Sequence, residues 1–170
     1  MTSSCENQAI PEAMTDLQQI DKILVICLGN ICRSPMAEGF LKKAQPGKMV
    51  ISAGITAMTG LPADPFSVRL MRAHDIDIGS HRAQNLTDWM VEAADLILTM
   101  DDEQTRFIER CYPSFTGPVM KIGHHGEFDV PDPYRLDLDA FRHSQQLILR
   151  GVNDVIEHVL QAPAVRSEPS

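Results

Sequence analysis

The sequence predicts an α/β fold in which a doubly wound parallel sheet lies between two layers of helices. Short apolar runs alternate along the chain with segments that have helical start signals, and this alternation is typical of parallel sheets. The first run, Ile23-Leu24-Val25-Ile26, is wholly aliphatic, as expected of a strand that is buried on both faces. A length of 170 residues with 44% apolar content suits one domain with a core of ordinary size.

Four short segments are expected to form the strands. Each is rich in aliphatic residues and is followed by a turn or by the start of a helix. They cover residues 22–27, 49–53, 95–100 and 119–122. Doubly wound sheets bind ligands at the carboxyl ends of their strands, and Cys27 lies at such an end.

Five helices are expected, over residues 35–45, 65–73, 88–93, 101–110 and 137–160. Ser34-Pro35 and Asp64-Pro65 each combine an N-cap residue with a proline in the first turn, and Thr87 is a candidate cap for the third helix. Apolar residues of the last helix fall on one stripe, which indicates packing against the sheet. They are Phe141, Ile148, Val152, Val155, Ile156 and Val159.

The folded domain is expected over residues 21–162. Residues 1–20 are polar, and they lack the basic and apolar regions of a signal peptide, so we interpret them as a flexible extension. Residues 163–170 are interpreted as a flexible tail. No run approaches the roughly 20 apolar residues of a membrane span, so membrane insertion is not expected.

Charge and cysteine content exclude further classes of protein. A net charge of −8 argues against nucleic-acid binding, which depends on a basic surface. Four cysteines, two of them in one loop, do not form a disulfide framework, and a catalytic thiol suits the reducing cytoplasm. His124 and His125 match no spacing typical of metal ligands, so no metal site is expected, and for His81 a structural hydrogen bond is favoured over catalysis.

The segment between the first strand and the first helix, CLGNICRS at residues 27–34, predicts an anion-binding loop. Gly29 and Asn30 tolerate the positive φ that a tight loop needs. Successive backbone N–H groups and the helix N-terminus converge on one point there. The expected phosphate-binding residues are Leu28, Gly29, Asn30, Ile31, Cys32, Arg33 and Ser34.

Cys27 and Arg33 give this loop a nucleophile and a phosphate clamp. The loop amides, the helix N-terminus and Arg33 favour the thiolate of Cys27, which is the form that attacks. Arg33 can bind two equatorial oxygens of a phosphoryl group in a planar fork, and the Ser34 hydroxyl can donate to the sulfur. The transition state is thereby stabilised without a metal ion or cofactor.

Asp132 is the expected general acid. It lies in the acidic segment 129–134, where Pro131 and Pro133 restrict the backbone and keep Asp132 out of a helix interior. A carboxylate held in this way can protonate the leaving oxygen and then activate water to hydrolyse a phosphocysteine.

These motifs resemble those of the low-molecular-weight protein tyrosine phosphatases. The matching stretches are CLGNICRSPMAE at 27–38, SAG at 52–54, HRAQ at 81–84, DLILTMD at 95–101 and PDPY at 131–134. The resemblance implies a three-layer fold with four strands in the order 2-1-3-4. It assigns nucleophilic attack to Cys27, phosphate binding to Arg33 and acid–base catalysis to Asp132.

The resemblance implies supporting roles as well. Asn30 and Ser52 are expected to brace the loop through a hydrogen bond, and Ser34 is expected to assist Cys27. Cys32 is the expected redox partner of Cys27, because a second thiol in the loop can capture an oxidised Cys27 as a disulfide. The residues expected to clasp the aromatic ring of a substrate are Leu28, Met58, Leu61 and Tyr134.

Within the family, residues 123–135 are most similar to the bacterial branch linked to tyrosine autokinases and exopolysaccharide export. The expected partner is therefore a tyrosine-phosphorylated protein, and specifically such an autokinase. Arg135 departs from the eukaryotic pattern, which has a second aromatic residue after Tyr134. The oligomeric state is left open.

Three other functions compete with phosphotyrosine hydrolysis. Arsenate reduction needs further cysteines to relay a disulfide, and none lies between Cys32 and Cys111. Protein arginine phosphatases share the fold, but their loops resemble this one with Thr in place of Ile31. A non-catalytic phosphotyrosine-binding module would not need the intact set of Cys27, Arg33 and Asp132.

Overall fold

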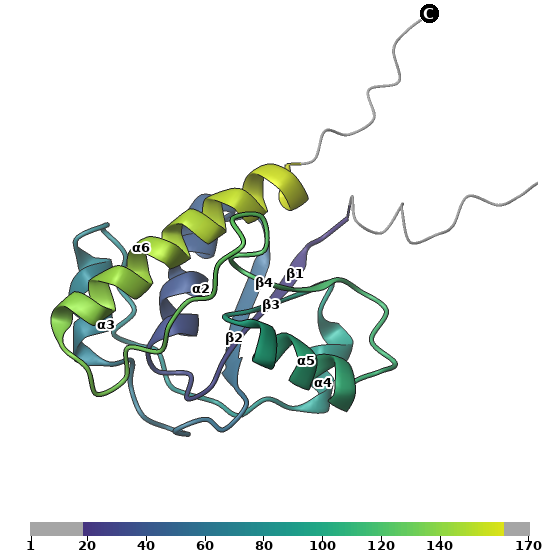
Figure 1. Ribbon diagram of the computed structural model, residues 1–170, viewed down its shortest axis with the longest axis horizontal. Coiled ribbons are helices and arrows are strands. Elements are labelled where there is room, and N and C mark those ends of the chain that lie inside the picture. The colour runs from purple at the N-terminus through teal and green to yellow at the C-terminus, as the bar shows by residue number, and fades with distance from the viewer. Residues whose placement is uncertain (1–18, 162–170) are drawn as a thin grey trace, which may run out of the picture.

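Four parallel strands form the sheet of the computed structural model, which describes residues 19–161 (Figure 1). The strands are β1 (Lys22–Cys27), β2 (Met49–Gly54), β3 (Leu96–Thr99) and β4 (Val119–Lys121), in the order β2-β1-β3-β4. Both neighbours of β1 pair with it in parallel, and β4 extends the sheet beyond β3. The predicted fold class and strand order are confirmed.

Helices cover both faces of this sheet (Figure 1). On one face lie α2 (Arg33–Ala44), α3 (Pro65–Arg72) and α6 (Leu138–Val155), while α4 (Asp88–Ala93) and α5 (Asp102–Cys111) lie on the other. All five predicted helices are present. One of them, α4, has the predicted bounds, and the other four differ from the prediction by one or more residues at one end or both. A π-helical turn, η1 (Ile156–Leu160), follows α6.

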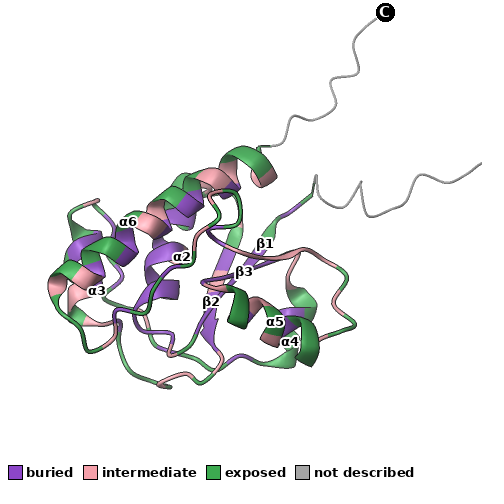
Figure 2. Ribbon diagram, viewed as in Figure 1, coloured by how far each residue is buried: buried purple, intermediate pink, exposed green. Residues whose placement is uncertain are grey.

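The aliphatic run Ile23-Leu24-Val25-Ile26 in β1 follows from the central position of this strand. Ile23 and Val25 point into the core beneath α2 and α6, while Leu24 and Ile26 pack with residues of α4 and α5. All four are at most 1% exposed, and Figure 2 shows the central strands as almost entirely buried. Burial on both faces leaves no place within this run for a polar side chain, whereas Lys22 at the start of β1 is exposed.

The start of α3 follows the predicted cap. The Asp64 carboxylate accepts a hydrogen bond from the Phe66 N–H at 2.9 Å, and Pro65 occupies the first turn. Thr87 occupies the N-cap position of α4 without a side-chain hydrogen bond to the helix.

The predicted cap at Ser34 is wrong. Helix α2 begins at Arg33, with Cys32 as its N-cap residue, so Ser34 lies inside the first turn. Its hydroxyl is turned to the sulfur of Cys27 and the amide of Asn30. The Ser34 hydroxyl is therefore hydrogen-bonded within the loop and does not cap the helix.

The last predicted helix, 137–160, changes character near its end. Asp137 caps α6 by accepting from the Ala140 N–H at 2.9 Å, and regular α-helix ends at Val155. Of the predicted stripe, the four residues within α6 are buried, whereas Ile156 and Val159 in η1 are only partly buried against the core.

Most of the expected extension and tail, residues 1–20 and 163–170, lies outside the described residues. Ile20 is described, and it is a core residue with 3% exposure rather than part of an extension. Within residues 19–161, no helix is both long and apolar enough to cross a membrane.

Candidate active site

The loop between β1 and α2 forms the floor of a crevice at the carboxyl end of β1. The crevice has a volume of about 210 Å³. Segments that lie far apart in the sequence meet there, because the loop after β2 and the segment before α6 supply its walls. The lining residues are Cys27, Leu28, Gly29, Ile31, Cys32, Arg33, Thr56, Met58, Asp132 and Tyr134.

The loop turns sharply at Asn30, which has a φ of 58°. This left-handed conformation is tolerated by Asn better than by most residues with a side chain. The turn brings the Asn30 N–H to 3.2 Å from the sulfur of Cys27, and the Ser34 hydroxyl lies 2.9 Å from the same atom. Gly29 has no positive φ, so the predicted need for glycine flexibility is wrong at that position.

The Asn30 side chain braces the loop from within. Its Nδ2 donates to Ser34 Oγ at 2.8 Å and to Ser52 Oγ at 3.0 Å, while its Oδ1 accepts from the Gln84 N–H at 2.9 Å. The residue is completely buried. The hydrogen bond between Asn30 and Ser52 is the one that the resemblance implies, and Gln84 is a further partner.

Glu38 and His81 extend this network outward. Ser52 donates to Glu38 Oε2 at 3.0 Å, and His81 Nδ1 lies 3.8 Å from the same oxygen. The Nε2 of His81 lies 2.7 Å from the carbonyl oxygen of Asn30. A carbonyl only accepts, so this nitrogen carries a proton and donates. His81 therefore makes the structural hydrogen bond that was favoured, whereas Glu38 was not foreseen.

Arg33 is a buried cation whose guanidinium is held from three sides. It is 4% exposed, and its Nη1 donates to the Val130 carbonyl at 3.0 Å. The Asp101 carboxylate lies 3.7 Å from Nη1, and the Asp132 carboxylate lies 3.4 Å from Nη2. These partners restrict the rotamers of a long side chain, so the guanidinium is oriented before any phosphate binds.

Asp101 was missed by the sequence reasoning, which placed it only as the start of a helix. It follows β3 and caps α5 by accepting from the Gln104 N–H at 2.8 Å. Because β3 lies directly beside β1, the residues that follow both strands meet at one edge of the sheet. That neighbour relation was the signal that could have identified Asp101.

Asp132 lies at the rim of the crevice with 41% of its side chain exposed. Its Oδ1 accepts a hydrogen bond from the Tyr134 N–H at 3.1 Å, and its Oδ2 faces Arg33. The segment is tied to α6 because the Ser144 hydroxyl donates to the Pro131 carbonyl at 2.7 Å. The carboxylate is thus held beside the crevice and remains open to solvent.

Cys27 and Cys32 are both free, buried thiols in the loop, with exposures of 2% and 4%. Burial is the main cause that raises the pKa of the Cys32 thiol, and the nearby carboxylates of Asp64 and Asp132 act in the same direction. Cys32 is therefore protonated near neutral pH. The two cysteines differ in surroundings, because among residues 19–161 the sulfur of Cys27 has hydrogen-bonding partners and that of Cys32 has none.

The walls of the crevice agree only in part with the expected substrate contacts. Leu28, Met58 and Tyr134 line it, but Leu61 does not. Leu61 is 45% exposed and lies farther along the loop after β2. Its N–H donates to the Met58 carbonyl and its carbonyl accepts from the Ala83 N–H, which holds that part of the loop in place. Thr56 lines the crevice and was not foreseen.

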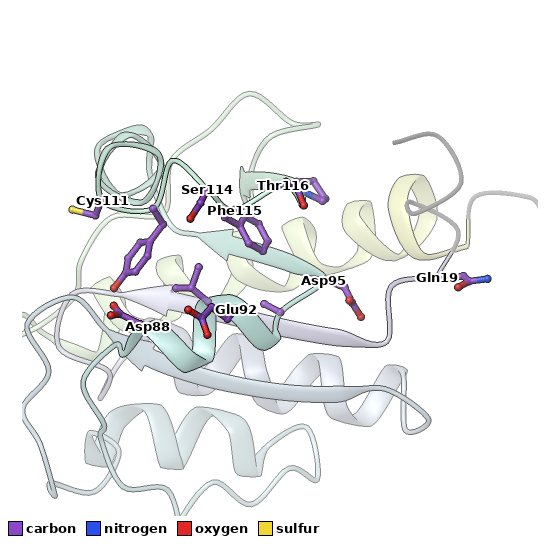
Figure 3. A pocket seen from close by; sticks show the side chains of 13 residues that line it. Gln19, Asp88, Glu92, Asp95, Cys111, Ser114, Phe115 and Thr116 are labelled. Atoms are coloured by element: carbon purple, nitrogen blue, oxygen red, sulfur yellow. The ribbon is translucent and has the colours of Figure 1, made fainter. Parts of the chain in front are cut away.

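Outside this crevice, the described part of the chain has a second cleft and no cluster of metal-ligating side chains. Within residues 19–161, no group of three or more His, Cys, Asp or Glu side chains is placed to hold a metal ion. A separate cleft of about 790 Å³ is lined by α4, by the end of α5 and by residues before β1, β3 and β4, at the opposite end of the strands. Figure 3 shows the side chains that line it. Asp95, at its edge, accepts from the N–H groups of Asp21 and Lys22.

The family model described as low molecular weight phosphotyrosine protein phosphatase matches residues 22–164. The chain belongs to this family. The probable low molecular weight protein-tyrosine-phosphatase EpsP of Ralstonia nicotianae is 52% identical over 134 residues, which cover 79% of this chain and 92% of the relative. The low molecular weight protein-tyrosine-phosphatase Wzb of Salmonella typhimurium is 40% identical over 132 residues, with coverages of 77% and 89%.

Solved structures support the same assignment. The tyrosine phosphatase amsI of Erwinia amylovora superimposes with a TM-score of 0.79 at 34% identity, over 83% of this chain and 94% of that one. The arginine phosphatase YwlE of Geobacillus stearothermophilus has a TM-score of 0.75 at 26% identity, over 81% and 91% of the two chains. The enzyme class is thus that of the protein-tyrosine phosphatases, and the arginine phosphatase shares the fold at lower identity.

Proposed function

We propose that this phosphatase hydrolyses phosphotyrosine in proteins through a phosphocysteine formed on Cys27. The observation that carries the proposal is the convergence of Cys27, Arg33 and Asp132 on one crevice at the carboxyl end of β1. A thiol with donors at its sulfur, an oriented guanidinium and a carboxylate at the rim are the three groups that phosphoryl transfer through cysteine requires.

In the first step the thiolate of Cys27 attacks phosphorus, and the bond from phosphorus to the tyrosine oxygen breaks. Arg33 and the loop amides bind the equatorial oxygens, on which the transition-state charge is spread. Asp132 gives its proton to the leaving phenolate oxygen. The carboxylate faces Arg33 across 3.4 Å, so a phosphoryl group bound to Arg33 lies within its reach.

In the second step water attacks the phosphocysteine, and the bond from sulfur to phosphorus breaks. Asp132, now a carboxylate, takes a proton from the water and is restored to its acid form. The departing thiolate is stabilised by the Ser34 hydroxyl and the Asn30 N–H, which lie 2.9 and 3.2 Å from the sulfur. Free phosphate leaves, and no metal or cofactor takes part in either step.

The crevice favours an aryl ester over an alkyl one. Cys27 is 2% exposed at its floor, whereas Leu28 at the rim is 47% exposed, so a substrate must reach inward past apolar walls. A phenolate, whose conjugate acid has a pKa near 10, also departs more easily than an alkoxide. Ile31 lines the crevice without offering a hydroxyl, which favours phosphotyrosine over phosphoarginine.

The proposed physiological partner is a bacterial tyrosine autokinase of a polysaccharide-export system, acted on in the cytoplasm. Support for the partner comes from the similarity of residues 123–135 to that branch of the family. Support for the compartment comes from the chemistry of Cys27, which needs a reducing environment. A purified autokinase that keeps its phosphotyrosine in the presence of the active enzyme would argue against this pairing.

A series of substituted phenyl phosphates tests the mechanism. Asp132→Asn is expected to slow esters with poor leaving groups far more than esters with good ones, because only the former need the proton. Wild-type turnover of phosphotyrosine should greatly exceed that of phosphoserine and phosphoarginine peptides. Equal slowing of the whole series by Asp132→Asn would remove Asp132 from the acid role, and comparable turnover of phosphoarginine would favour an arginine phosphatase.

A further inference from the structure

A shallow cleft opens from the mouth of the crevice and runs along α5. Its volume is about 720 Å³, and Leu28, Arg33 and Asp132 line both it and the crevice. A protein substrate whose phosphotyrosine enters the crevice must place its neighbouring residues on the surface near the mouth. The cleft along α5 is continuous with that mouth, so it is suited to hold the flanking segment.

Part of the lining of this cleft is apolar. Leu28, Ile55 and Phe107 line it, and all three are at least partly exposed to solvent. These side chains come from three different segments: the catalytic loop, the loop after β2, and α5. An apolar surface of this kind accepts an extended peptide of varied sequence, because it makes few directional contacts.

Charged side chains of both signs line the cleft. Five acidic residues line it. Asp101 and Asp132 face Arg33, and Asp102 and Asp129 both bind Lys121, at 3.1 and 2.9 Å. Glu103 is exposed and forms no ion pair with another of the described residues 19–161. All of these carboxylates except that of Glu103 therefore face a cation of the protein.

Arg106 and Arg110 differ from them. Both line the cleft and are exposed, and neither forms an ion pair with another of the described residues 19–161. They stand four residues apart on α5, a spacing that puts their Cβ atoms about 5–6 Å from each other on one face of a helix. Two guanidinium groups at that separation can bind one anionic group together.

We propose that the cleft binds the segment that flanks phosphotyrosine, and that Arg106 and Arg110 bind an anionic side chain in it. This inference rests on the proposed function and adds a preference among phosphotyrosine substrates. The anion is a carboxylate or a second phosphate, since a guanidinium fork binds either in the same planar geometry. Such recognition of acidic or phosphorylated motifs by grouped arginines is a general mode of peptide binding.

The length of α5 sets the position of that side chain relative to phosphotyrosine. Asp101 lies 3.7 Å from Arg33 and directly precedes the helix. With a rise of about 1.5 Å per residue, Arg106 lies about 8 Å and Arg110 about 14 Å farther along the axis. An extended peptide advances about 3.3 Å per residue. The anionic residue is therefore expected about two to four positions from phosphotyrosine.

Matched peptides test the inference. Each carries one phosphotyrosine and, two to four residues before or after it, a Glu, a Gln or a phosphonate analogue of phosphotyrosine that cannot be hydrolysed. The readout is the ratio of kcat/KM between an anionic peptide and its Gln counterpart, so that general losses of activity in a variant cancel. For wild type we expect a ratio of about five to ten for Glu on one side, and a larger one for the phosphonate.

The variant Arg106→Gln/Arg110→Gln should bring this ratio close to one. In Arg106→Glu/Arg110→Glu the ratio should fall below one, so that the Gln peptide becomes the better substrate. Arg142→Gln serves as control, because Arg142 is an exposed arginine on α6 that does not line the cleft. The wild-type ratio should also fall in high salt, since both arginines are exposed.

Each result bears on the proposal. Turnover of all peptides with a ratio of one in wild type would overturn the anion subsite and leave the phosphatase function intact. A ratio that survives in the double variant, or that falls equally in Arg142→Gln, would overturn the role of Arg106 and Arg110. Absence of turnover of every phosphotyrosine peptide by wild type would instead overturn the proposed function.

Discussion

Substitution of Asn30 tests how the catalytic loop is held in its turn. Asn30→Ala removes three hydrogen bonds, to Ser34, Ser52 and the Gln84 N–H, and each is worth about 1 kcal/mol of net stability. It also places a non-glycine side chain without polar groups in the left-handed region, at φ 58°, which costs about 1 kcal/mol more. We expect the free energy of unfolding to fall by about 4 kcal/mol.

Asn30→Gly separates the two contributions. It loses the same three hydrogen bonds, but glycine accepts a positive φ at no steric cost. Because glycine also raises the entropy of the unfolded chain, the net advantage of Gly over Ala is expected to be only about 0.5–1 kcal/mol. Urea unfolding of the three proteins at one pH measures these differences, provided that the slope with denaturant stays constant.

Activity provides the second measurement for the same variants. The loop amides near Cys27 are positioned by the turn at Asn30, so kcat/KM should fall at least about tenfold in both variants, by a general loss of transition-state stabilisation. A loss of less than about 1.5 kcal/mol in Asn30→Ala would refute the bracing account. So would a Gly variant less stable than the Ala variant, since the left-handed turn would then carry no strain.

Three further predictions concern the reacting groups. Cys27→Ser should abolish turnover and still bind inorganic phosphate within about tenfold of wild type by calorimetry; loss of binding would show that the thiol, not the loop, holds the anion. Asp101→Asn should keep the helix cap but lower kcat/KM about tenfold with little change in Tm, because Arg33 loses a carboxylate that orients it; unchanged kinetics would argue against this role. Peroxide should oxidise Cys27 to a sulfenic acid. The Cys32 thiol then condenses with this sulfenic acid, and a disulfide and water are formed. Dithiol should then restore wild type but not Cys32→Ser. Because burial raises the pKa of Cys32, disulfide closure should speed up as pH rises from 6 to 9, and equal recovery of the Cys32→Ser variant would leave Cys32 a packing residue.

Much of the fold could be predicted because its signals are local. The run Ile23-Leu24-Val25-Ile26 is short and wholly aliphatic, so it predicts a buried strand. Asp64-Pro65 combines two signals for a helix start. Ser34-Pro35 carries the same two signals, yet the helix starts two residues earlier than they predict. There the hydroxyl has better partners in Cys27 and Asn30, so local propensity yields to tertiary contacts.

The candidate site divides in the same way. Cys27, Arg33 and the loop between them lie within one short stretch, so their meeting follows from chain connectivity alone. Glu38 and Asp101 act on the loop through a neighbouring strand or helix, and no local pattern distinguishes them from surface carboxylates. Leu61 shows the converse error, because an apolar residue in a loop was placed in the crevice without knowledge of the path of that loop.

The strand order explains why these distant residues bear on the loop from two sides. Since β1 lies between β2 and β3, the carboxyl ends of both neighbours flank the segment that follows β1. Ser52 of β2 holds the Asn30 turn, while Asp101, which follows β3, faces the Arg33 guanidinium. Substitutions on the β2 side should therefore change the shape of the loop and lower both stability and activity. Substitutions on the β3 side should change the orientation of Arg33 and lower activity with little loss of stability, and the Asn30 and Asp101 variants together measure that difference.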